Sequence, residues 1–169
     1  MFKVFWCLIG ATCFMVAAPE PEPQYHQGIN TLARHDLLAQ FVEIRHQPCL
    51  FKTSLCPDRC GHACDVAVLK TAGYFAWEKF SKYGEAPQGT FYYKVSPAKT
   101  DEATDEKIQN QLKGLQPGQW VKLEWEHQYL VNDHGSYPAR PITHLTLLTP
   151  EAAKALQAKV DPKISFLAR

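Results

Sequence analysis

The chain has 169 residues, of which 18 are Lys or Arg and 17 are Asp or Glu, with a formal net charge of +1. This near-neutral balance excludes the electrostatic footprint of a nucleic-acid-binding protein and the polybasic patch of a membrane-surface protein. The length is that of one domain, and aromatic residues make up 12% of the chain, enough to bury a core without depending wholly on disulfides.

The first residues have the pattern of a secretory leader. A lone Lys3 precedes an apolar run that ends in small residues, and a Pro/Glu-rich stretch follows. The run is shorter than the roughly 20 residues that a membrane helix needs. We expect a signal peptide at 1–18, a spacer at 19–30 and a single β-barrel-like domain at 31–169, with export to the periplasm or the extracellular space. A retained N-terminal anchor is the alternative, because Pro19 directly follows the expected cleavage point.

Three strands are expected in the first half of the domain. Residues 36–46 end in β-forming side chains and predict a strand, although the leucines of this region also suit a helix over 30–41. Residues 65–77 predict a second strand with a bulge or bend at Gly73. The aromatic and β-branched run at 90–95 predicts a third.

The second half begins with a change of period. Ile108, Leu112 and Leu115 recur at helical spacing and predict a helix within 100–115. Apolar and polar side chains then alternate strictly over 119–131, which indicates a long, half-buried antiparallel strand.

The C-terminal third completes the predicted order. A turn at 132–135 leads to a fifth strand at 141–148, and Thr149, Pro150 and Glu151 are typical of the start of a short C-terminal helix. A helix between the third and fourth of five strands is the order of an OB-like barrel. We therefore predict a mainly β (α+β) fold of this kind; a small α+β sandwich fits the same order.

Four cysteines remain after the expected leader: Cys49, Cys56, Cys60 and Cys64. Exported cysteines in even number are usually oxidised, and four allow three pairings. We favour Cys56 with Cys60 and Cys49 with Cys64, since the outer disulfide would tie the end of the first strand to the start of the second.

Metal binding is the alternative for the same cluster. Cys56, Cys60, His62 and Cys64 offer three thiolates and an imidazole, which suit zinc, and thiolates also bind copper(I). His127 is a further candidate ligand. The cluster is more crowded than the usual structural zinc site, so we expect disulfides and no cofactor. A redox-active pair of cysteines is a third interpretation, without the βαβ context that it normally has.

His127 lies on the apolar side of the strand at 119–131, between Trp125 and Tyr129. Either it is a core histidine held by a hydrogen bond, or it faces the mouth of the barrel and a ligand. Residues after the next turn would line the same cavity. The candidate ligand-binding residues are His127, Trp125, Tyr129, Tyr137 and Arg140.

Two motifs carry a resemblance. One is CPDRCGH at 56–62 followed by DVAV, and the other is Trp-x-His-x-Tyr at 125–129 leading into GSYPARP at 135–141. Together they resemble a family of small exported bacterial proteins of uncharacterised function, over about residues 40–148. The resemblance implies an exported bacterial domain in which both motifs belong to one structural unit, and it implies no reaction or ligand.

No established catalytic motif, such as G-x-S-x-G or H-E-x-x-H, occurs in the chain. We therefore expect an exported, non-enzymatic binding or adaptor module of the bacterial envelope, stabilised by disulfides. Its partner would be a small ligand, a glycan or a peptide. The alternatives are a zinc- or copper-binding protein and a hydrolase whose site is assembled from dispersed residues.

Overall fold

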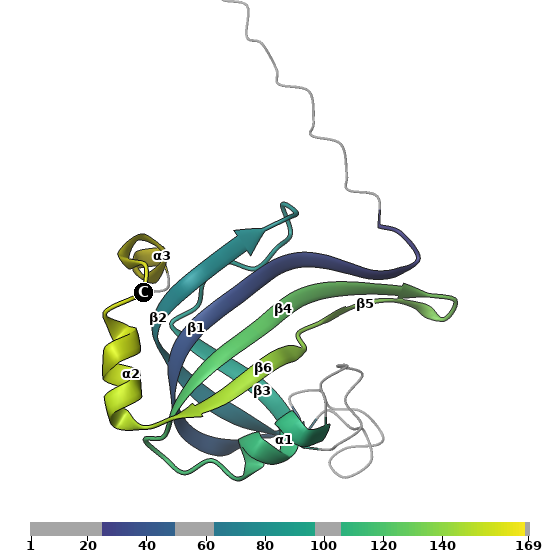
Figure 1. The fold of residues 1–169 in the computed structure, drawn as a ribbon. Helices are drawn as coiled ribbons and strands as arrows, with labels where there is room; N and C mark the ends of the chain where they lie inside the picture. Colours follow the sequence, from purple (N-terminus) through teal and green to yellow (C-terminus); the bar gives the residue numbers. More distant parts are fainter. Residues whose placement is uncertain (1–24, 50–62, 97–105, 168–169) are drawn as a thin grey trace, which may run out of the picture.

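A computed structural model describes residues 25–49, 63–96 and 106–167, and it shows a mainly β protein with few helices (Figure 1). The elements are β1 (Gly28–Gln47), β2 (Cys64–Lys79), β3 (Thr90–Ser96), α1 (Glu106–Lys113), β4 (Trp120–Asn132), β5 (Gly135–Ala139), β6 (Ile142–Leu148), α2 (Pro150–Gln157) and α3 (Pro162–Leu167). The strands form one antiparallel sheet in the order β3-β2-β1-β4-β5, with β6 also paired to β4. The sheet curls into a half-barrel.

The central strand β1 is the longest and determines the curl. It pairs with β2 along one edge and with β4 along the other, and its pairing with β2 shifts register at three places. Such irregularities bend a strand and increase its twist. The alternative helix over 30–41 is wrong, because Leu37, Leu38 and Ala39 are all buried within a strand that packs on both faces. The strand starts at Gly28, so it includes the last residues of the expected spacer.

The predicted alternation of β4 is present from Val121 to His127 and ends there, because Gln128 is buried as well. Val121, Leu123, Trp125 and His127 are buried, while the side chains between them are partly exposed. Phe91 of β3 stacks on Trp125 with ring centroids 4.8 Å apart, although β3 and β4 are not neighbours in the sheet. The two strands therefore meet across the concave side of the curl, and the hydrophobic core fills that side.

Two strands follow β4 where the sequence predicted one. β6 matches the predicted strand at 141–148, whereas β5 was not predicted. Both pair with β4, β5 along its C-terminal half and β6 along its N-terminal half. Residues 136–140 were assigned no strand, and Pro138 lies among them. It is tolerated because β5 is an edge strand.

The helices lie at one end of the curl and on its outside (Figure 1). α1 buries Leu112, and Leu115 just beyond it is also buried in the core. α2 begins at the predicted cap, where the side chain of Thr149 accepts a hydrogen bond from the amide of Ala152. α3 was not predicted. No helix within the described ranges combines the length and the hydropathy that crossing a membrane requires.

The predicted irregularity at Gly73 is present, and it allows the C-terminal segment to approach β2. The register with β1 shifts beside Gly73, and the amide of Asp161 donates to the carbonyl of Tyr74 at 2.7 Å. A Cβ at Gly73 would lie 2.8 Å from the side chain of Val160. Only a residue without a side chain fits this contact without displacing the segment.

We predict that Gly73→Ala destabilises the protein by about 1–3 kcal/mol, the usual effect of overpacking. Gly114→Ala is the matched control, because its Cβ would meet its nearest neighbours at 3.5 and 3.6 Å. It should change stability by less than about 1 kcal/mol. Urea unfolding of both variants measures the difference, and equal stabilities would contradict the contact.

Candidate functional site

The loop between β2 and β3, residues 80–89, is pinned to the strands on both sides. The amide of Phe80 donates to the carbonyl of Leu32 at 2.9 Å. The hydroxyl of Tyr74 donates to the carbonyl of Gln88 at 3.1 Å and accepts from its amide at 2.8 Å. A Cβ at Gly84 would collide with the carbonyl oxygen of Leu32. Glycine is therefore required there, and the next residue, Glu85, is held in place.

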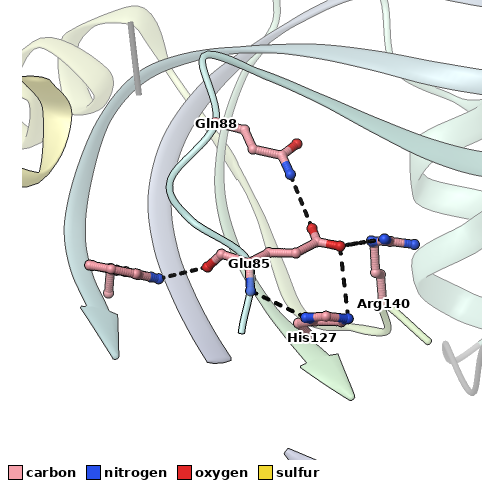
Figure 2. A network of polar contacts seen from close by, with 5 residues as sticks. Glu85, Gln88, His127 and Arg140 are labelled. Atoms are coloured by element: carbon pink, nitrogen blue, oxygen red, sulfur yellow. Dashed lines mark hydrogen bonds and ion pairs between the residues drawn. The ribbon is translucent and has the colours of Figure 1, made fainter. Parts of the chain in front are cut away.

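Glu85 is the centre of a polar network that joins this loop to β2, β4 and the β5–β6 connection (Figure 2). Its Oε1 accepts from Nε of Arg140 at 2.6 Å and from Nη2 of the same side chain, and its Oε2 accepts from Nε2 of Gln88 at 3.0 Å. Its amide donates to Nδ1 of His127 at 3.2 Å, and its carbonyl accepts from Nε1 of Trp77 at 3.0 Å. We call these five residues the Glu85 network.

The network defines the protonation of His127. Because Nδ1 accepts a hydrogen bond, the proton of the neutral ring is on Nε2, which lies 3.8 Å from Oε1 of Glu85. Burial lowers the pKa of His127, Glu85 raises it and Arg140 lowers it, with a net decrease. The imidazole is therefore neutral at pH 7, and the charge of Glu85 is balanced by Arg140.

A second buried histidine lies beside the network on β1. His35 is 2% exposed and stacks on Trp125, with ring centroids 3.8 Å apart and an interplanar angle of 9°. Within the described residues neither ring nitrogen has a hydrogen-bond partner. Burial lowers the pKa of His35 to about 4, opposed by Glu85 and assisted by His127. This ring is also neutral at pH 7.

Two cavities flank the Glu85 network. The first, of about 350 Å³, we call the seam cavity; its lining residues are Gln47, Cys64, Val66, Glu85, Gln88, Phe91, Tyr92, Tyr93, Lys94 and Arg140. The second, of about 370 Å³, we call the tyrosine cavity; its lining residues are Tyr25, Leu32, Tyr83, His127, Tyr129 and Pro138. Both combine aromatic walls with a few polar groups, which is the usual make-up of ligand sites.

A third hollow, of about 490 Å³, lies on the outer polar face. Its lining has four carboxylates, from Asp36, Glu78, Glu124 and Glu126, and one guanidinium, from Arg34. Arg34 contacts Glu126 at 2.7 Å, and Lys122, beside the hollow, lies 3.1 Å from Asp36 and 2.9 Å from Glu124. The cross-strand pairs Arg34–Glu126 and Lys122–Asp36 stabilise the sheet, and with Lys122 included this face keeps a formal charge of −2.

The structure brings three of the five candidate ligand-binding residues to the site. His127 and Tyr129 line the tyrosine cavity, and Arg140 lines the seam cavity. Trp125 is 1% exposed in the core and lines the third hollow instead of these two cavities. Tyr137 is half-buried opposite Leu130 of β4 and lines neither of them.

Sequence reasoning missed the loop residues. Glu85 and Gln88 lie in the stretch Gly84–Gly89 (GEAPQG), which reads as an ordinary connection between strands. One signal was available. Glu85 lies in a short segment with Gly84, Pro87 and Gly89, and glycine and proline often occur where the backbone conformation is constrained. Two partners of Glu85, His127 and Arg140, are 42 and 55 residues away in the chain, so the sequence alone did not identify them.

The cysteine cluster is described only in part. Three of its members lie outside the described residues: Cys56, Cys60 and His62. Cys64 begins β2 opposite Gln47, and Cys49 follows two residues after Gln47, so β1 and β2 bring the two cysteines to adjoining ends. The structure shows no disulfide between Cys49 and Cys64. In the described ranges no three His, Cys, Asp or Glu side chains are grouped as metal ligands. Both the disulfides and the metal site stay predictions.

The geometry defines a class of site: a charge-balanced polar network between two aromatic-walled cavities of a curled sheet. Comparisons with protein-family models, with curated proteins and with solved structures found no match. The function is therefore inferred from the site itself.

We predict opposite pKa changes at His127 for two substitutions in the network. Arg140→Met removes a charge that lowers the pKa of His127 and should raise it, whereas Glu85→Gln removes a charge that raises it and should lower it. Arg34→Met is the control, because Arg34 contacts Glu126 instead. NMR titration of the imidazole nitrogens measures the shifts; shifts of the same sign in both network variants would contradict the assignment.

We also predict that the protein loses stability in mild acid. A histidine whose pKa is lower in the folded state binds fewer protons when folded, so stability is complete above pH 6.5 and falls as the pH decreases toward 4. His35 alone should account for a loss of about 2 kcal/mol at pH 5. His35→Phe should flatten the stability curve between pH 7 and pH 5, and His144→Phe, at an exposed position, should not. Denaturant unfolding at each pH tests this.

Proposed function

We propose that the chain is an exported, non-enzymatic binding module of the bacterial envelope, whose ligand occupies the cavities beside the Glu85 network. The observation that carries the proposal is the placement of Arg140 and His127, held by one carboxylate between two aromatic-walled cavities. Aromatic walls with a few fixed polar groups hold a ligand in one orientation. The partner class is a small ligand, a glycan or a peptide.

Binding fits this geometry better than acid–base catalysis. A general base needs a free lone pair within reach of a substrate proton. In His127 the lone pair on Nδ1 is engaged by the amide of Glu85, and Nε2 carries the proton. The carboxylate of Glu85 is engaged by Arg140 and Gln88. The groups of the network are therefore set to donate hydrogen bonds and to hold positions.

We infer that the half-barrel is of the OB-like type. The strand order β3-β2-β1-β4, a fifth strand divided into β5 and β6, and α1 between β3 and β4 in the chain support this assignment. OB-type barrels bind their ligands on the face of the second and third strands. In this chain the seam cavity has β2 and β3 on one side, which agrees with that mode of binding.

We infer further that export and oxidation stabilise the module. The leader-like sequence pattern at 1–18 and the even number of cysteines after it support this. The adjoining positions of Cys49 and Cys64 would let a disulfide fasten β1 to β2.

For the exported protein, purified without reductant, we predict a mass lower by four protons than that of the reduced chain, with no bound metal. Native and denaturing mass spectrometry measure both quantities. Stoichiometric zinc or copper with titratable thiols would instead establish the metal-binding alternative.

We predict that a ligand screen observed by NMR will report on the site. The probes are aromatic carboxylates, oligosaccharides and short peptides, added to ¹⁵N-labelled protein. Amide shifts should cluster at Glu85 and His127, and Arg140→Met should weaken the binding of acidic probes by about tenfold or more. Arg34→Met, on the outer face, should not. The proposal fails if no probe binds, or if the shifts cluster on the outer face instead.

A further inference from the structure

One oxygen of Glu85 faces two side chains that can carry a positive charge (Figure 2). Oε1 accepts from Nε and Nη2 of Arg140, and it lies 3.8 Å from Nε2 of His127. The other oxygen, Oε2, accepts from Gln88 at 3.0 Å. While the imidazole is neutral, Glu85 and Arg140 balance each other. A protonated His127 would raise the formal charge of the three side chains from zero to +1 in a place largely shielded from water.

The hydrogen bond between the loop 80–89 and His127 exists only while the ring is neutral. The amide of Glu85 donates to Nδ1 at 3.2 Å. In an imidazolium both ring nitrogens carry protons, so Nδ1 and the amide would be two donors facing each other. Proton uptake therefore breaks this bond. It also places a positive charge on a ring whose Nε2 already points toward the carboxylate of Glu85.

Exposure decides which of the two cations gives way. The side chain of His127 is 9% exposed and belongs to β4, whereas that of Arg140 is 40% exposed and lies on the connection between β5 and β6. A buried charge needs a partner of opposite sign, but a charge at the surface can be hydrated instead. A protonated His127 is therefore expected to take Oε1 of Glu85, and Arg140 to turn toward water.

The other titratable groups around His127 leave this exchange between two cations. His35 of β1 is buried, and burial lowers its pKa to about 4, so its ring stays neutral in mild acid. A charge on His127 would lower the pKa of His35 further. Three phenols, which carry no charge in acid, line the tyrosine cavity with His127. They belong to Tyr25, Tyr83 and Tyr129.

Mild acid is the range in which His127 can take up a proton. Burial lowers its pKa, Glu85 raises it and Arg140 lowers it, with a net decrease from 6.5. The neutral ring therefore predominates at pH 7, and the protonated ring appears as the pH falls below 6.5. A metal does not compete for the ring in the described ranges, where no three His, Cys, Asp or Glu side chains are grouped as ligands and Nδ1 is engaged by the amide of Glu85.

We propose that proton uptake by His127 in mild acid moves Glu85 from Arg140 to His127, detaches the amide of Glu85 from the ring and releases the guanidinium of Arg140 to solvent. The chain then presents a neutralised arginine at pH 7 and an unpaired one in acid. This inference goes beyond the proposed binding function, because the change is a property of the free protein and requires no ligand.

NMR of the ligand-free, ¹⁵N-labelled protein between pH 7 and pH 5 tests the exchange. The three signals to follow are the imidazole nitrogens of His127, the amide of Glu85 and the Nε–H of Arg140. All three should change with one midpoint below pH 6.5. Hydrogen exchange of the Glu85 amide, corrected for its intrinsic pH dependence, should become about tenfold faster, since one hydrogen bond is lost. Exchange of the Arg140 Nε–H should become faster by a similar factor.

Two variants separate His127 from its neighbour. His127→Asn keeps an oxygen acceptor near the position of Nδ1 but cannot take up a proton, so the signals of Glu85 and Arg140 should no longer depend on pH. His35→Phe is the matched control, because it removes the other buried imidazole and should leave the transition in place. If His127→Asn does not fold, the common midpoint in the unmodified protein decides the question alone.

Four results would overturn the inference. They are a His127 that stays neutral down to pH 5, a His127 that titrates without change at Glu85 or Arg140, a transition that persists in His127→Asn, and a simultaneous loss of all native amide signals, which is global unfolding. The ligand screen at pH 7 tests the proposed binding function separately. Either proposal can therefore fail while the other stands.

Discussion

The site depends on one carboxylate in a place largely shielded from water. Glu85 has a side chain that is 17% exposed, and a charge in such a position needs a partner to be tolerated. Arg140 supplies it, and through it the loop 80–89 is fastened to the connection between β5 and β6. The amide and carbonyl of Glu85 add bonds to His127 and Trp77. One residue thus sets the position of the loop, the tautomer of His127 and the direction of Arg140.

That arrangement is possible because β1 bends. A regular β1 would pair evenly with its neighbours, whereas the three register shifts against β2 curl the sheet and bring β3 opposite β4 on the concave side. Stacking of Phe91 on Trp125 fills the space that the curl creates. β3 and β6 are not paired with each other within the described residues, and the seam cavity is lined by residues of β3 and by Arg140, which lies between β5 and β6.

The sequence predicted the elements whose signal is local. The alternation at 119–131 identified β4 and its buried side, because every second side chain as far as His127 faces the core. Thr149 and Pro150 identified the start of α2, where the side chain of Thr149 accepts a hydrogen bond from the amide of Ala152. The strand β5 was missed because Pro138 is acceptable only on an edge, and an edge is a property of the whole sheet. Likewise His127 was recognised as unusual, but its partner Glu85 comes from a distant loop that carries no periodic pattern.

The two ends of the curl differ in the polar groups that are buried there. At the α1 end, Leu112 and Leu115 complete an apolar core. Toward the loop 80–89 the core instead contains His35 and His127, buried imidazoles that lose stability in acid where an aromatic hydrocarbon ring would not. A sequence selected only for stability would replace them with phenylalanine. Local departures from good packing are expected where function requires them, and here they surround the only carboxylate–guanidinium pair that lines the seam cavity in the described residues. The stability given up around this pair is the physical reason for our proposal that the ligand binds beside it.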